Sequence, residues 1–345
     1  MSQGDAQIWQ GSGAGVATET AEPAATASAP TAPAAPSPPG TAAKAPAALA
    51  ALAGPEADAS ATTVPTNKRR SVTARLGGWL LVNELRTMFR RNRNLVLLAA
   101  LAAIPVAIGI AIKVTEHSRG QDAGGFLTQV SNNGLFLVFA ALSLTLPIFL
   151  PMALGVVSGD SISGEAAQGT LRYLLVAPVG RVRLLAVKGV SLAVFCLVST
   201  TVVALAALAT GLALFPSGPV TLLSGDSIGM GAATVKAAWI TLLVAASLLG
   251  LAALGLFVST LTDTPIAAMA VATGVTIVCG IVQAIPQLSS IQPWLYTAQW
   301  PSYADVLRDP VYLADIEHNL VIQAGYVVVF TLAAWARLTT RDVSS

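Results

Sequence analysis

Long runs of apolar residues alternate with short charged stretches from about residue 95 to the end of the chain. A helix needs roughly 17–25 mostly apolar residues to cross a bilayer. Runs of that length predict six transmembrane helices, at residues 95–114, 135–157, 185–214, 234–259, 264–286 and 319–338. Because backbone polar groups find no water in lipid, these runs are expected to be α-helical. The pattern therefore predicts an all-α membrane protein with its transmembrane domain in residues 95–345.

The segment before the first run divides into two parts. Residues 1–67 are rich in Ala, Pro, Ser, Thr and Gly and poor in large apolar side chains, which predicts a disordered cytoplasmic tail. Residues 68–94 are basic, with apolar residues at helical spacing and a separate arginine stripe formed by Arg86, Arg90 and Arg93. This is typical of an amphipathic helix at the membrane interface that faces anionic lipid with its arginines. A basic flank that only fixes topology is compatible with the same residues.

Two features predict irregularities within the membrane part. Pro147 and Pro151 fall inside the second run, so that helix is expected to be kinked or broken. The connection 287–318 carries aromatic residues and prolines, which favour short interfacial or re-entrant elements. An aromatic belt and a lid over an exit path both fit this connection. Gln283 is the most polar side chain deep in a run, and it is expected to bond a neighbouring helix.

Composition and charge agree with a membrane protein and orient it. Only 10% of residues are charged, against about 25% in soluble domains. Most lysines and arginines lie before the first run, in or beside residues 158–184, or after the last run. The positive-inside rule then places both termini, residues 158–184 and residues 260–263 in the cytoplasm. The expected location is the cell (cytoplasmic) membrane, as a multi-pass protein.

Residues for catalysis are absent from the pattern. The two histidines, His117 and His318, are far apart, and neither a zinc motif nor a serine-nucleophile motif occurs. No phosphate-binding P-loop is present, and no run carries an acid or base near its centre. Cys196 and Cys279 fall within runs and are interpreted as buried apolar residues. We therefore expect a non-catalytic chain that binds no cofactor, metal or nucleic acid itself.

The most informative stretch is the amphipathic connection 155–188 between the second and third runs. Asp160 or Ser161 can cap a helix there, with Glu165 in its first turn and Gln168 and Arg172 as neighbours on its polar side. The residues alone leave two interpretations open, an ordinary interfacial helix with solvated charges and a helix that docks on a partner protein.

This stretch resembles the signature of ABC-2 type transporter permeases. The residues that carry the resemblance are Gly164, Glu165, Gly169, Thr170, Leu171, Leu174, Pro178, Val179, Arg181, Leu184 and Lys188. The basic helix before the first run, the short loop 259–263 and the long connection before the last run extend it over roughly residues 75–340. The Ala/Pro-rich tail departs from the family pattern.

The resemblance implies the membrane subunit of an ABC exporter. Its partners would be a second permease copy or sister subunit and a separate P-loop ATPase that binds ATP and Mg²⁺. The helix near residues 161–176 would couple to that ATPase, through Asp160, Glu165, Gln168, Thr170, Arg172 and Arg181. The helix at residues 68–94 would form an elbow on the inner membrane face. The alternatives are a stand-alone secondary transporter or channel, and a membrane scaffold.

Overall fold

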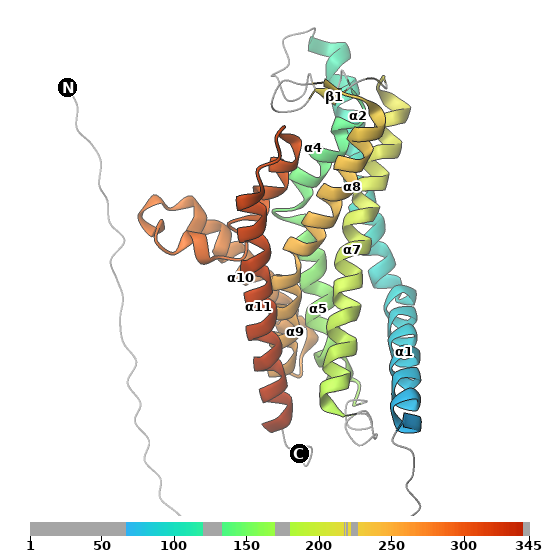
Figure 1. Ribbon diagram of the computed structural model, residues 1–345, viewed down its shortest axis with the longest axis vertical. Coiled ribbons are helices and arrows are strands. Elements are labelled where there is room, and N and C mark those ends of the chain that lie inside the picture. Colours follow the sequence, from blue (N-terminus) through green and yellow to red (C-terminus); the bar gives the residue numbers. More distant parts are fainter. Residues whose placement is uncertain are drawn as a thin grey trace, which may run out of the picture. The chain divides into compact units, whose positions relative to one another are not determined.

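The computed structural model describes residues 67–119, 133–169, 180–216, 218, 220–221 and 227–340 (Figure 1). The α-helices in this part of the chain are α1 (Asn67–Arg90), α2 (Asn92–Arg119), α4 (Phe136–Thr145), α5 (Phe149–Ala167), α7 (Arg181–Leu214), α8 (Met230–Ser247), α9 (Leu249–Leu261), α10 (Pro265–Ala284) and α11 (Leu313–Thr340). Two short strands, β1 (Val220–Thr221) and β2 (Ser227–Ile228), pair antiparallel between α7 and α8. The tail expected for residues 1–67 lies outside the described residues, apart from Asn67.

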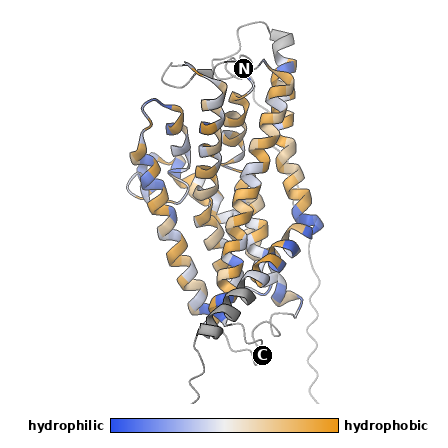
Figure 2. Ribbon diagram, turned by 45° about the vertical axis from the view of Figure 1, so that its right-hand side comes forward, coloured by the Kyte–Doolittle hydropathy of each residue, from blue (hydrophilic) through white to orange (hydrophobic). Residues whose placement is uncertain are grey.

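The all-α membrane class is confirmed. Within the part of the chain that the structure describes, five helical segments are long and apolar enough to cross a bilayer, with α8 and α9 together forming one of them. The pair α4 and α5 makes a sixth if it is counted as one span. Each of these segments overlaps one predicted run, because burial in lipid is a property of composition that a sequence displays directly. Figure 2 shows the apolar residues along the middle of these helices and polar residues gathered toward their ends.

The second span is broken where prolines predict a break. Its two halves meet at an angle of 55° across residues 146–148. Proline lacks an N–H and its ring clashes with the preceding turn, so Pro147 cannot continue the α4 helix regularly. The expectation of a kinked or broken span is confirmed.

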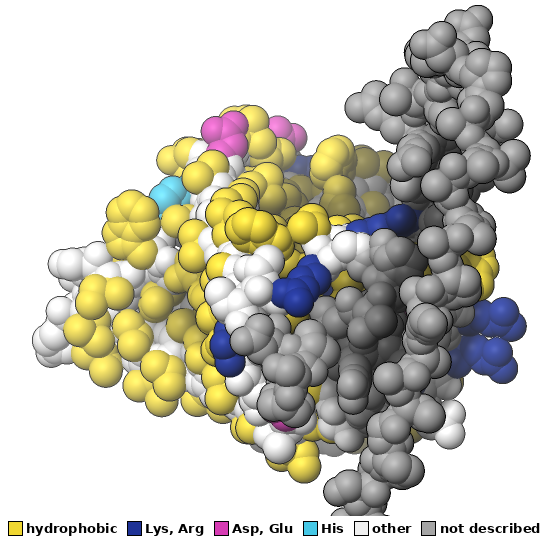
Figure 3. Space-filling view, turned by 90° about the horizontal axis from the view of Figure 1, so that it is seen from below, with side chains coloured by type: hydrophobic (Ala, Val, Ile, Leu, Met, Phe, Trp, Pro, Cys, Tyr) yellow, Lys and Arg dark blue, Asp and Glu magenta, His cyan; other side chains and the backbone are white. Residues whose placement is uncertain are grey.

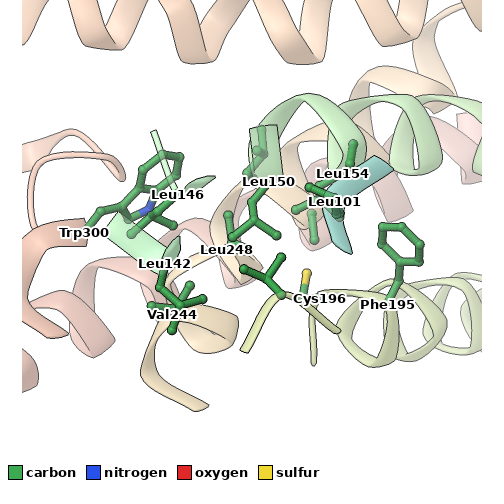
Figure 4. Packing of buried hydrophobic residues seen from close by; sticks show 14 of the residues in the cluster. Leu101, Leu142, Leu146, Leu150, Leu154, Phe195, Cys196, Val244, Leu248 and Trp300 are labelled. Atoms are coloured by element: carbon green, nitrogen blue, oxygen red, sulfur yellow. The ribbon is translucent and has the colours of Figure 1, made fainter. Parts of the chain in front are cut away.

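Helix α5 is central to the packing of the bundle. It contacts α9 and α10 along much of its length, while α7 packs on α2 and α4, and α11 packs on α9. The buried core runs through the bundle and includes Leu142, Leu154 and Phe195 (Figure 4). Helices α9 and α10 are joined by only three residues, 262–264, and pack against each other, as the short loop predicts.

Small residues let α5 approach its neighbours closely. A Cβ atom added at Gly159 would lie 2.7 Å from the backbone nitrogen of Met269 in α10. A Cβ atom at Gly255 in α9 would lie 2.0 Å from the hydroxyl oxygen of Ser158. Such small-residue contacts are a common means of close helix association in membranes, where apolar side chains gain little by leaving lipid for protein.

The connection between α10 and α11 is folded against the bundle. It contains three short 3₁₀-helices, η2 (Pro286–Leu288), η3 (Gln292–Trp294) and η4 (Trp300–Leu307). Tyr296, Trp300 and Tyr303 are buried, and Figure 4 shows Trp300 beside Leu146 at the break of the second span. An aromatic belt in contact with lipid is therefore wrong for these three residues, although Trp294 is exposed.

A buried amide network ties this connection to the turn between α8 and α9. The Gln323 side chain of α11 accepts a hydrogen bond from the Gly250 backbone N–H at 3.1 Å and donates one to the Tyr296 carbonyl at 2.7 Å. Asn319 donates to the Ser247 hydroxyl at 2.6 Å. Leu248 forms a turn that interrupts the helix between α8 and α9. Near this interruption the side-chain oxygen of Gln323 satisfies the Gly250 N–H. These contacts position η4 and α11 relative to α9.

Candidate functional site

The site residues expected at the end of the second span lie within one continuous helix. Helix α5 runs to Ala167, so Asp160 and Ser161 are in its interior. The prediction that either residue caps a new helix, after a span ending near Val157, is therefore wrong. The helix continues because its next turn stays inside the protein, with Ile162 fully buried.

Asp160 joins α5 to the start of α2. Its carboxylate accepts hydrogen bonds from Arg91, at the junction of α1 and α2, and from the Nη2 atom of Arg93 at 2.7 Å. The Asp160 side chain is only 9% exposed, whereas the two arginines keep about two-fifths of their surface in contact with solvent. The two guanidinium groups compensate a carboxylate that would otherwise be costly to bury.

Lys188 makes a second ionic link, between α5, α7 and α1. Its Nζ atom donates to the Glu84 carboxylate at 2.6 Å and to the Glu165 carboxylate. The Lys188 side chain is 5% exposed, and those of Glu165 and Glu84 are 18% and 27% exposed. A buried ammonium with two carboxylates is a satisfied arrangement, but removing one partner leaves charge uncompensated.

These charges form what we term the basal ion-pair cluster, which consists of Glu84, Arg91, Arg93, Asp160, Glu165 and Lys188. They surround a cavity of about 60 Å³, whose wall also includes Asn94 and Ser191. The cluster connects four elements, α1, α2, α5 and α7, at one end of the bundle. Figure 3 looks onto that end and shows lysine and arginine side chains among its exposed groups.

Ser259 of α9 fixes the same turn of α5 from the opposite side. Its hydroxyl oxygen accepts hydrogen bonds from the backbone N–H groups of Ile162 and Ser163, at 3.0 and 2.9 Å. The hydroxyl donates to the Gly159 carbonyl at 2.7 Å. One buried side chain thus bridges three backbone groups of α5, so the end of this helix is attached to α9 as well as to the cluster.

The remaining residues expected at the coupling segment are spread over different surroundings. Gln168 is exposed just after the end of α5. Arg181, at the start of α7, donates to the carbonyls of Leu338 and Thr339 at the end of α11. Thr170 and Arg172 lie outside the described residues. A cation at the carboxyl end of α11 is favourable because the last carbonyls of a helix carry partial negative charge.

The arginine stripe expected on the first helix is divided. Arg86 and Arg90 are exposed on α1, as the prediction of a basic face requires. The chain breaks at Arg91, so Arg93 belongs to α2 and pairs with Asp160. A single stripe through all three arginines is therefore wrong, because the break changes the helical register. Contact of α1 with the membrane interface stays a prediction.

The sequence alone does not assign Glu84, Arg91 or Ser259 to this site. Glu84 and Arg91 fall in the predicted amphipathic segment, and Ser259 falls in the predicted short loop. Lys188 is among the residues that carry the family resemblance, but its ion pairs are not predicted. A single lysine near the end of an apolar helix is a weak sign that this lysine forms an ion pair. The neighbouring sequence does not indicate which acidic residues are its partners. Gln283 does form a hydrogen bond, but to Thr297 of the connection between α10 and α11 and not to a neighbouring helix.

Comparison with protein-family models places most of the chain in a known family. The family model described as "ABC-2 family transporter protein" matches residues 79–343, from α1 to beyond the end of α11. No curated protein matches the chain. The matched region includes every residue of the basal ion-pair cluster.

Proposed function

Because this chain belongs to the ABC-2 family of transporter proteins, we propose that it is an exporter's membrane subunit, driven by a separate ATPase. The family supports the coarser description, a permease of an ABC transporter in a membrane, directly. The ATPase, its point of contact and the direction of transport are the parts that we propose. Export is the direction favoured by the resemblance of residues 155–188 to ABC-2 permeases.

The observation that supports this proposal most directly is the attachment of the C-terminal end of α5 to the neighbouring helices. Helix α5 leads directly into residues 168–180, the connection that we propose as the contact of the ATPase. The end of α5 is linked by ion pairs to α1, α2 and α7 and by Ser259 to α9. A displacement of the connection would therefore reach four other helices through charged or hydrogen-bonded contacts. That is what coupling to an external ATPase requires.

The proposed orientation follows from charge. The elements that meet at the basal ion-pair cluster also lie next to the stretches that are rich in lysine and arginine. The end of α11 is at the same end, because Arg181 bonds its last carbonyls. We place this end in the cytoplasm by the positive-inside rule, where an ATPase could reach Gln168.

Copurification tests the proposed function. The tagged chain, extracted from its native membranes in mild detergent, is expected to bring down a P-loop ATPase in stoichiometric amount. Gln168→Trp should reduce that amount, because a large ring would be placed at the contact surface. Gln287→Trp is the matched control. Gln287 is also exposed, but it lies in η2 just after α10, whereas Gln168 lies just after α5.

Three outcomes would count against the proposal. A pure chain with no ATPase, under conditions that keep known ABC complexes intact, would favour a stand-alone transporter. An equal loss of ATPase in both variants would place the contact elsewhere. Transport by the purified chain in vesicles without ATP would establish the stand-alone alternative.

A further inference from the structure

A cavity of about 210 Å³ lies beside the break in the second span. Three segments that are distant in sequence form its wall: the bend between α4 and α5, the last turns of α10, and the connection that contains η4. The lining residues are Ser143, Leu146, Pro147, Thr276, Gly280, Gln283, Thr297, Trp300, Pro301 and Tyr303. The 55° bend of the second span contributes Leu146 and Pro147 to this wall.

The wall combines apolar surfaces with hydroxyl and amide groups. The hydroxyls of Ser143 and Tyr303 are 2.6 Å apart, and the Gln283 amide donates to the Thr297 hydroxyl. Trp300, the prolines and Leu146 supply flat or apolar surfaces. Every residue in this wall is uncharged. Burial raises the pKa of the Tyr303 phenol further above its usual range, so this phenol adds no charge to the wall.

The surroundings decide which molecules could enter. Pro147, Gly280 and Pro301 are exposed at the edge of the cavity, while Thr276, Thr297 and Trp300 are buried. Helices α4 and α10 belong to segments apolar and long enough to span a membrane, so lipid is the medium from which a molecule would reach this edge. An ion would have to leave water and enter a wall that offers no opposite charge, at a high cost. A neutral molecule with one or two hydrogen-bonding groups would meet no such cost.

We propose that this cavity binds the ring-bearing part of an uncharged amphipathic molecule that reaches it from the membrane. Ligand pockets usually enclose about 300–1,000 Å³, so the cavity fits a ring-sized part of a larger molecule. Gln283 and Ser143 would exchange their present partners for a hydroxyl or carbonyl group of the ligand. The assignment of this ligand as a transported substrate rests on the proposed function, whereas its binding does not.

A second groove gives an internal comparison. About 350 Å³ lies between α4, α7 and α8, lined mainly by leucine and alanine. Its threonines include Thr241 and Thr234, whose hydroxyls bond carbonyls of their own helix. Polar groups therefore do not converge there from different segments, and no ligand is proposed for it.

Photolabelling of the purified full chain in lipid nanodiscs tests this proposal. The probe is 4-(hydroxymethyl)benzophenone, a neutral diaryl ketone, compared with its carboxylate and trimethylammonium analogues. The neutral probe is expected to label residues 143–147, 276–283 or 297–303 saturably, as located by mass spectrometry. The charged analogues should bind at least about tenfold more weakly.

Variants show whether the polar groups contribute. Gln283→Leu should weaken labelling about fivefold, the factor expected for one hydrogen bond. Ser143→Ala, a smaller change, serves if Gln283→Leu does not fold. Thr241→Val, in the second groove, should leave the labelling unchanged. Non-saturable labelling, equal labelling by all three probes, labelling in the second groove, or no effect of the cavity variants would overturn the proposal.

The binding measurement needs no ATPase, so it fails independently of the proposed function. Saturable labelling of a chain that copurifies with no ATPase would keep the cavity and remove the transport role. An ATPase-bound chain without saturable labelling would keep the proposed function and remove the cavity as a binding site.

Discussion

Replacing Lys188 by methionine is expected to lower the free energy of unfolding by about 2–3 kcal/mol. Removing one partner of a buried ion pair usually costs about 3–5 kcal/mol, and the partial exposure of Glu84 reduces that figure. Methionine fills similar space but removes the cation that faces the Glu84 and Glu165 carboxylates. The measurement is thermal unfolding of the purified chain in detergent, supported by its oligomeric homogeneity.

The charge explanation has a specific control. The triple variant Lys188→Met, Glu84→Gln, Glu165→Gln should recover much of the stability, because no uncompensated charge is left. Lys236→Met is the matched lysine replacement, since Lys236 bonds only the carbonyls of Val306 and Arg308 among the contacts described. A smaller loss in Lys188→Met than in Lys236→Met would contradict the role that we assign to the basal ion-pair cluster.

Gly159→Ala is expected to destabilise the bundle by at least about 1–3 kcal/mol, the usual cost of overpacking. The added Cβ atom would lie 2.7 Å from the Met269 nitrogen and 2.9 Å from the Ala268 carbonyl carbon. These are backbone atoms of α10, so α5 and α10 would have to separate. Thermal unfolding and the yield of monodisperse protein in detergent would measure the effect.

Two other glycines give a graded comparison. At Gly155 the nearest atom to an added Cβ is the Thr273 hydroxyl oxygen at 2.6 Å, which belongs to a side chain that can rotate. At Gly274, on α10, nothing lies within 4 Å. The expected order of destabilisation is therefore Gly159→Ala, then Gly155→Ala, then Gly274→Ala. A Gly274→Ala variant as unstable as Gly159→Ala would refute close packing as the cause.

The membrane-spanning segments and the broken second span could be predicted because their causes are local. A long apolar run needs only its own composition to be assigned to lipid. Pro147 disrupts a helix through its own ring and missing N–H. The prediction for Asp160 was wrong because it also used only local information. The residues around Asp160 match a capping pattern, but the partners that bury this side chain are distant in sequence. Arg91 and Arg93 lie 69 and 67 positions away from it.

The polar contacts could not be predicted because the residues that form them are far apart in the sequence. Lys188 meets Glu84 across 104 positions, and Ser259 meets Ile162 across 97. Nothing in the apolar period of a helix specifies which distant polar group its neighbour will present. The break at Leu248 is also tertiary in origin, since Gln323 of α11 takes the Gly250 N–H that the turn releases. The family resemblance drew attention to residues 155–188, but the contacts made by that stretch could be seen only in the fold.

Cysteine cross-linking in native membranes tests most directly whether an ATPase contacts the C-terminal end of α5, which we propose to lie in the cytoplasm. Both cysteines of the chain are buried, so Gln168→Cys and Gln287→Cys each add one accessible thiol, the first just after α5 and the second in η2 just after α10. The account predicts that a short bifunctional reagent joins Gln168→Cys to a P-loop ATPase and leaves Gln287→Cys unlinked. A cross-link from Gln287→Cys alone, or labelling of Gln168→Cys by an impermeant maleimide applied outside intact cells, would contradict it.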